Sequence, residues 1–80
     1  MTIPVILPKP GMGTEEGAVL RWLKAVGDAV KQGEPIVEIE FAKATQEVEA
    51  PVGGTLARIL LAEGAMGPVG SPIAEIEEHG

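Results

Sequence analysis

Two runs of alternating apolar and polar residues meet near the middle of the chain. Alternation with a period of two is typical of strands, and two adjacent runs predict a hairpin. One parity of the two runs is expected to face a core: Val37, Ile39, Phe41, Gln46, Val48 and Ala50. The other parity carries glutamates that are expected to face water: Glu38, Glu40, Glu47 and Glu49. The hairpin turn then contains Lys43, the only cation between Glu34 and Ala57.

Strand-like runs separated by glycine and proline lie on both sides of this hairpin. Residues 2–8 alternate, and the two prolines within them favour a short or edge strand. Glycine and proline predict a surface loop over 9–16. Further strands are expected over 17–24, 29–31 and 35–41.

The second half of the chain repeats the first at a shift of 37 residues. The shift places identical residues on one another: Gly17 on Gly54, Arg21 on Arg58, Gly27 on Gly64, Gly33 on Gly70, Pro35 on Pro72, and Glu38–Glu40 on Glu75–Glu77. These glycines are expected at turns with positive φ or at close backbone approaches. The repeat predicts a domain with a pseudo-two-fold axis. Because residue 80 is equivalent to Lys43, the lysine turn is expected at one end and both termini at the other.

The first half of the chain is longer than the second before the repeat begins. Pro8 aligns with Pro51 at a shift of 43, so the first half has six additional residues, which belong to the Lys9–Glu16 loop. A loop longer than its counterpart is either a tolerated insertion or a recognition element. The residues alone favour neither of these two interpretations of the loop.

Composition limits the classes of protein to consider. An 80-residue chain without cysteine has room for one small domain and no disulfide. Few aromatic residues and many glycines and prolines favour short strands, and hence an all-β fold. A net charge of -6 argues against nucleic-acid binding and suits either simple solubility or a basic protein partner. No apolar run approaches the about 18 residues that span a bilayer, so a cytoplasmic or organelle-matrix protein is expected.

The sequence contains no recognisable set of catalytic residues. Ser71 is the only serine and precedes a proline, and His79 lies near the end of the chain, so a nucleophile with its base is not expected. Trp22 is equivalent to Ile59 in the repeat, which indicates a core position with the indole N–H at its edge. The two methionines beside glycines, Met12 and Met66, are interpreted as gap-fillers. Lys43 remains the candidate, in a turn that lacks the usual Asn-Gly or Asp-Gly.

Over nearly all its length the chain resembles the lipoyl domains of the acyltransferase (E2) component of 2-oxo acid dehydrogenase complexes, within the biotinyl/lipoyl carrier family. The matching residues are Leu7–Lys9, Glu16–Gly17, Trp22, Val26–Asp28, Val30, Gly33–Glu34, Glu38, Glu40, Lys43–Ala44, Glu47–Val48, Pro51, Gly54 and Glu63–Gly64. The resemblance implies a flattened β-barrel or sandwich of two four-stranded antiparallel sheets. It also implies that lipoic acid is attached to the Lys43 amine by an amide bond.

The same resemblance implies a swinging-arm carrier rather than an enzyme. In this family a thiamine-dependent decarboxylase (E1) acylates the lipoyl group, the acyltransferase catalytic domain (E2) passes the acyl group to coenzyme A, and dihydrolipoamide dehydrogenase (E3) reoxidises the dithiol. A lipoate ligase or lipoyl transferase attaches the cofactor. The domain is expected to be monomeric and to cover residues 1–78, with 79–80 a tail or the start of a linker. The expected location is the cytoplasm, or the mitochondrial matrix in a eukaryote.

Recognition residues also follow from the resemblance. Glu40 matches a position associated with the ligase, and Ala42 and Ala44 flank the lysine. The loop residues implied in partner recognition are Lys9, Gly11, Met12, Thr14 and Glu15. Ala42 stands where most members place aspartate. Two alternatives stay open: a biotin carrier domain, whose lysine is usually flanked by methionines, and an unmodified interaction module with the same fold.

Overall fold

The computed structural model describes residues 1–9, 15–42 and 44–79, which form strands and turns. The strands are β1 (Thr2–Ile6), β2 (Glu16–Trp22), β3 (Ala29–Val30), β4 (Pro35–Phe41), β5 (Ala44–Glu49), β6 (Gly54–Ile59), β7 (Met66–Pro68) and β8 (Pro72–Glu78). Within these ranges there is no helix long and apolar enough to cross a membrane. The expected strands are all present, with ends that differ by one or two residues.

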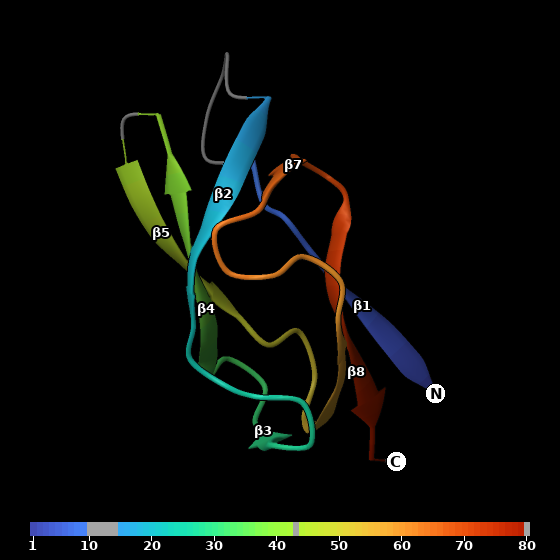
Figure 1. Cartoon of the computed structure of the whole chain (residues 1–80). Helices are drawn as coiled ribbons and strands as arrows, with labels where there is room; N and C mark the ends of the chain where they lie inside the picture. Colours follow the sequence, from blue (N-terminus) through green and yellow to red (C-terminus); the bar gives the residue numbers. More distant parts are fainter. Residues whose placement is uncertain (10–14, 43, 80) are drawn as a thin grey trace.

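Two four-stranded antiparallel sheets make up the fold (Figure 1). The strand order is β1-β8-β6-β3 in the first sheet, called sheet A here, and β5-β4-β2-β7 in the second, called sheet B. Each sheet keeps two open edges, so the arrangement is a flattened sandwich and not a closed barrel. The predicted all-β architecture is confirmed. Pro4 lies in β1, an edge strand of sheet A that has a neighbouring strand on one side only. A proline, which has no backbone N–H, is tolerated in such an edge strand.

The pseudo-two-fold symmetry extends to the register of the strands. Val19 pairs with Ile39 and Arg21 with Glu38, so Leu20 forms a bulge, and the pairing of β6 with β8 has the equivalent bulge at Ala57. Each sheet also mixes the two halves of the chain. Sheet A joins β1 and β3 to β6 and β8, and sheet B joins β2 and β4 to β5 and β7. Neither half therefore contains a complete sheet.

Aliphatic side chains fill the space between the sheets, and the described residues include no buried polar or charged side chain. The core consists of Val5, Leu7, Val19, Val30, Ile36, Val37, Ile39, Phe41, Val48, Ala50, Leu56, Ile73, Ala74 and Ile76. Strict alternation is wrong at two equivalent places. Ile36 is buried beside Val37, and Ile73 beside Ala74, because a register shift inserts one extra residue there.

Gln46 is a second correction to the predicted pattern. It has the inward parity of β5 but is exposed. The cause is its position on β5, which is an edge strand of sheet B. Polar glutamine is compatible with that site because it remains in contact with water.

The repeated glycines occupy the special positions that the sequence predicts. Four of them have positive φ: Gly27 at 97°, Gly33 at 86°, Gly64 at 84° and Gly70 at 86°. The other repeated pair marks close approaches. A Cβ added at Gly17 would lie 2.8 Å from Phe41 Cε1, and one at Gly54 would lie 2.1 Å from the Glu77 carbonyl oxygen. Glycine is required at Gly54, where the obstacle is backbone, whereas at Gly17 an added Cβ would meet side-chain atoms.

Trp22 joins the core at its margin. Its half-buried ring packs against the core cluster, and its Nε1–H donates a 2.9 Å hydrogen bond to the carbonyl oxygen of Leu61. A partner for the indole N–H at the edge of the core is the arrangement expected for a partly buried tryptophan. The sequence-based interpretation of this residue is confirmed.

Candidate functional site

The lysine-bearing hairpin consists of β4 and β5, which pair along their whole length. Phe41 pairs with Ala44, so β4 and β5 are joined by a short connection. Ala42 and Ala44 are exposed, and Lys43 lies outside the described residues. The last pairs of the hairpin and the two chain ends lie at opposite ends of the molecule (Figure 1). Near those ends, the Met1 amide carbonyl accepts a hydrogen bond of 2.9 Å from the backbone N–H of Glu78.

Phe41 connects the end of the hairpin to the neighbouring strand. Its side chain is only 5% exposed, and its ring covers Gly17 of β2. The strand pair also places Ala18 opposite Glu40. Because the ring fills the space that a β-carbon would need, Gly17 and Phe41 act as a matched pair. They attach the residues before Lys43 to the body of sheet B.

The outer surface of sheet B is strongly acidic. It carries Glu16 on β2, Glu38 and Glu40 on β4, and Glu47 and Glu49 on β5. Glu38 lies directly opposite Glu47, and like charges in that position repel. Arg21 reduces the repulsion through an ion pair of 3.2 Å to Glu38.

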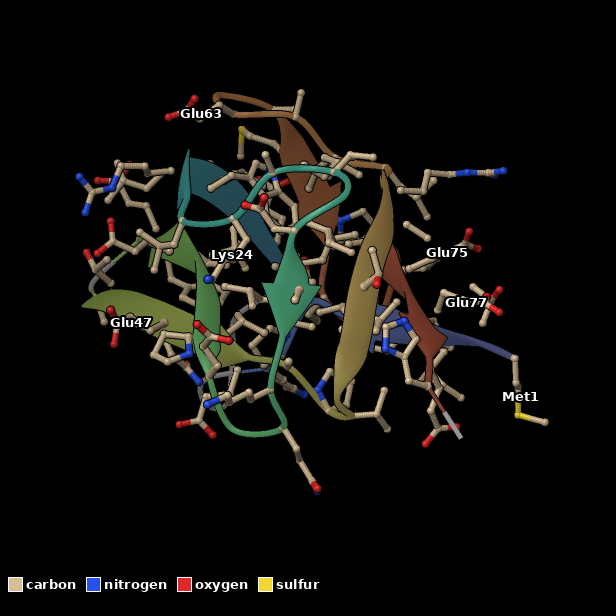
Figure 2. All side chains as sticks on the ribbon, turned by 90° about the horizontal axis from the view of Figure 1, so that it is seen from below. Met1, Lys24, Glu47, Glu63, Glu75 and Glu77 are labelled. Atoms are coloured by element: carbon tan, nitrogen blue, oxygen red, sulfur yellow. The ribbon has the colours of Figure 1, made fainter. Side chains whose placement is uncertain are left out.

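Sheet A has fewer acidic groups on its outer surface. Arg58 and Glu75 form the equivalent ion pair at 3.7 Å, and Glu77 accepts hydrogen bonds from the N-terminal ammonium and from Thr2. These two bonds, the ammonium first, lower the pKa of Glu77. Figure 2 shows Glu47 on one side of the molecule and Glu75 and Glu77 on the other. The acidic surface therefore lies on the sheet that carries the lysine hairpin.

The predicted recognition loop begins after β1 and ends at β2. Lys9 and Glu15 are exposed at its two ends, whereas Gly11, Met12 and Thr14 lie outside the described residues. The backbone of Glu15 is held in place, because its carbonyl oxygen accepts a 2.9 Å hydrogen bond from the N–H of Val69. Since β2 starts beside the last residues of β4, this end of the loop lies at the hairpin end of the molecule (Figure 1).

A shallow groove lies directly beside the hairpin turn. It is lined by Glu16, Gly17, Ala18, Glu40, Phe41, Ala42 and Met66. Met66 is 60% exposed, so its interpretation as a buried gap-filler is wrong. This groove could not be predicted from the sequence, because its residues come from three strands that become neighbours only in sheet B.

A second groove lies beside Trp22, between the segments 23–28 and 59–63. Its lining includes Lys24, which forms an ion pair of 3.0 Å with Glu34 (Figure 2 labels Lys24). The backbone N–H of Lys31, and then Lys24, lower the pKa of Glu34. Both groups belong to structural interactions of the turn before β4. None of the residues that line this groove was predicted from the sequence to attach a cofactor.

Residues 3–76 match the family model described as "Biotin-requiring enzyme", which covers biotin and lipoyl domains. The chain belongs to the biotin/lipoyl family. The predicted resemblance to lipoyl domains of acyltransferase (E2) components is confirmed, because similar proteins of known name are such components. The chain is 44% identical over 73 residues to the dihydrolipoyllysine-residue acetyltransferase component of the pyruvate dehydrogenase complex of Mycobacterium tuberculosis, covering 91% of this chain and 13% of that protein.

Relatives from other complexes are similar to the same extent. Identity is 42% over 78 residues with the succinyltransferase component of the 2-oxoglutarate dehydrogenase complex of Rickettsia typhi, covering 98% of this chain and 20% of that protein. It is 43% over 76 residues with the acetyltransferase component of the acetoin cleaving system of Bacillus subtilis, covering 95% and 19%. This biotin/lipoyl domain thus spans a fifth or less of each of these relatives.

Solved structures of two kinds superimpose on the domain. The solution structure of the lipoyl domain of the 2-oxoglutarate dehydrogenase complex from Azotobacter vinelandii has a TM-score of 0.74 and 33% identity, covering 95% of this chain and 99% of that one. The urea carboxylase of Kluyveromyces lactis has a TM-score of 0.81 and 26% identity, covering 96% of this chain and 6% of that one. The higher identity lies with the lipoyl domain.

The described residues of this biotin/lipoyl domain fit a covalently attached lipoyl group. The neighbours of Lys43 in sequence are small and exposed, which leaves space for an enzyme to approach the amine. The chain contains no cysteine that could react with a dithiolane. The hairpin is anchored through Phe41, so the attachment point has a defined place on the sheet.

Proposed function

We propose that residues 1–78 are a lipoyl carrier domain that bears lipoate on the Lys43 amine. The domain moves acyl groups and reducing equivalents between the active sites of a 2-oxo acid or acetoin dehydrogenase complex. The observation that carries the proposal is the sequence position of Lys43 between two paired strands, at the hairpin that lies opposite the chain ends. The similarity to three kinds of acyltransferase component supports it.

The residues of the chain supply placement rather than chemistry. The lysine stem extends the attachment point from the sheet, and an amide bond removes its positive charge. Phe41 and Gly17 fix the base of the hairpin, and the exposed Ala42 and Ala44 leave the turn accessible. Attached lipoate would supply the disulfide that accepts an acyl group together with two electrons.

The proposed partners are those of such a complex. They are a lipoate ligase or lipoyl transferase, the thiamine-dependent decarboxylase, the acyltransferase catalytic domain and dihydrolipoamide dehydrogenase. The acidic outer surface of sheet B suits partners with basic surfaces. We also propose that the domain is monomeric and works in the cytoplasm, or in the mitochondrial matrix of a eukaryote.

Intact mass after co-expression with a lipoate ligase tests the proposal. We expect one lipoyl adduct that maps to Lys43 and is absent from Lys43→Arg, because a guanidinium keeps the charge but is a poor acyl acceptor. A biotin adduct after co-expression with a biotin ligase instead would favour the biotin carrier, which the superposition with urea carboxylase keeps as the second candidate. A chain that stays unmodified in its native host would refute both.

Ala42→Asp is expected to increase the rate of lipoylation by about three- to tenfold. An aspartate can form a hydrogen bond within the turn, and a net gain of about 1 kcal/mol raises the population of the ordered turn by that factor. Ala42 is exposed and lies outside the strands, so the fold should not change. The rate is measured with purified ligase, and the matched control is Ala44→Asp on the other side of the lysine. Equal rates for wild type and Ala42→Asp would contradict this expectation.

A further inference from the structure

The four strands at the edges of the two sheets differ in how their free edges are protected from further pairing (Figure 1). β1 contains Pro4, β3 has two residues, and β7 has three residues, the last of which is Pro68. Proline and short length are common devices that keep an edge strand from pairing with another chain. β5 has six residues and no proline. Among the described edge strands, it alone offers a long edge without such a block.

The internal repeat shows that the fold does not impose this open edge. β1 and β5 are equivalent strands at a shift of 43 residues. Pro4, which lies opposite Glu75 in sheet A, therefore corresponds to Glu47, which lies opposite Glu38 in sheet B. A proline at this position is compatible with the same pairing of strands, yet β5 retains a residue with a backbone N–H.

The backbone groups of alternate residues in β5 point away from β4. Ala50, the residue after β5, donates its N–H to the Glu34 carbonyl oxygen at 2.9 Å and accepts a bond of 2.9 Å from the N–H of Gly33. Both backbone groups of Ala50 thus face the β4 side, and the two directions alternate along an antiparallel strand. The residues whose N–H and C=O face the free edge are Thr45, Glu47 and Glu49.

The part of β5 that follows the hairpin turn is also exposed on both of its faces. Residues 44–47 are all exposed, and Gln46 is among them although it has the inward parity. A strand that approaches the free edge along these residues therefore meets backbone groups that no described side chain buries.

The charges beside the edge determine which strand fits it. Glu47 and Glu49 lie on the outer face of sheet B, and neither forms an ion pair with another described residue. A second copy of β5 would bring carboxylates close to carboxylates, which is unfavourable, whereas lysine or arginine on the added strand would be attracted. A proline excludes every partner, but these glutamates repel only acidic ones.

We propose that the free edge of β5 accepts one antiparallel strand from a partner protein, with lysine or arginine at alternate positions. The basic side chains lie on the outer face of sheet B beside Glu47 and Glu49, and the backbone of the same residues exchanges hydrogen bonds with β5. Backbone bonds supply affinity, and the alternating charges select the partner. Strand addition needs no attached cofactor, so it is independent of the proposed function.

A short peptide in which lysine alternates with valine is the probe. On titration, the amide NMR signals of Thr45, Glu47 and Glu49 are expected to shift and their hydrogen exchange to slow, because their N–H groups become bonded. The signal of Thr2, the equivalent of Thr45 in β1, should stay unchanged, since Pro4 interrupts that edge. A peptide with glutamate in place of lysine should not bind, and added salt should weaken binding of the lysine peptide.

Methylation of the peptide backbone tests the pairing itself. In the proposed arrangement the backbone N–H groups of the lysines face β5, and those of the valines face away. A methyl group on the backbone nitrogen of each lysine is therefore expected to lower the affinity at least about tenfold, through lost hydrogen bonds. The same methylation on the valines should leave the affinity unchanged, although both peptides carry the same charge.

Glu47→Pro and Glu47→Gln separate the backbone edge from its charge. The glutamine variant loses one exposed charge and should bind the lysine peptide about two- to fivefold more weakly than wild type. The proline variant loses the same charge and also the N–H, as in β1, and should bind at least about tenfold more weakly than Glu47→Gln. Should Glu47→Pro not fold, the two methylated peptides decide the question with the wild-type protein.

Three results would overturn the proposal. The first is the absence of shifts for the three amides at every soluble concentration of the lysine peptide. The second is equal affinity of the two methylated peptides, which would assign binding to side-chain charge alone. The third is protection of the three amides that grows with protein concentration in the absence of peptide, which would make the partner a second copy of the chain. None of these measurements uses lipoylation, so intact mass remains a separate test of the proposed function.

Discussion

Gly54→Ala is expected to lower the free energy of unfolding by at least about 3 kcal/mol, or to prevent folding. The new Cβ would lie 2.1 Å from the carbonyl oxygen of Glu77 and 2.9 Å from its carbonyl carbon. These are backbone atoms of β8, the strand that pairs with both β1 and β6. The clash can be relieved only by separating β6 from β8, because a backbone cannot rotate away as a side chain can. Urea unfolding followed by circular dichroism measures the loss.

Two other glycine variants serve as controls for Gly54→Ala: Gly53, its neighbour in sequence, and Gly17, its equivalent in the repeat. At Gly53 the nearest atom to an added Cβ is 3.7 Å away, so Gly53→Ala should change stability by less than about 0.5 kcal/mol. At Gly17 the closest atom is Phe41 Cε1 at 2.8 Å, and a ring can move, so a loss of about 1–3 kcal/mol is expected. Equal stability of Gly54→Ala and Gly53→Ala would show that β6 and β8 are farther apart than described.

Ile39→Ala and Ile76→Ala are each expected to cost about 2–5 kcal/mol. The two isoleucines are equivalent in the repeat, and both side chains are fully buried, Ile39 in β4 and Ile76 in β8. Removing three carbons leaves a cavity between the sheets in either case. Because each sheet takes strands from both halves of the chain, the two losses should be of similar size.

Trp22 fluorescence and circular dichroism together follow these two variants. Trp22 lies in sheet B and Ile76 in sheet A, so coincident transitions for Ile76→Ala mean that the sheets unfold as one unit. Ile6→Ala is the control, because Ile6 is 42% exposed on an edge strand and should lose less than about 1 kcal/mol. A large loss for one isoleucine and a small one for the other would contradict a single cooperative core.

Much of the architecture could be predicted because the chain repeats itself. The glycines at positive φ, the hairpin and the opposite placement of the chain ends all follow from residues that recur at a constant shift. Periodicity could not predict the bulges that bury Ile36 and Ile73, because a bulge is set by pairing with a neighbouring strand. The order of the strands within the two sheets has the same origin and is likewise invisible along the chain.

The candidate site was predictable to a different extent for each of its parts. Lys43 and its neighbours form one continuous stretch, so a family pattern identifies them directly. The groove was not predictable, since Glu40, Ala18 and Met66 come from three strands that become neighbours only because β2 lies between β4 and β7.

The pairing of the first strand with the last strand has a consequence for biosynthesis. β1 leaves the ribosome before its partner β8, which ends only at Glu78. Chains are made from the N-terminus at a few residues per second, so β1 stays unpaired for several seconds while the remainder is translated. Pro4 removes one N–H donor from β1, which limits pairing of this strand with other chains until sheet A can close.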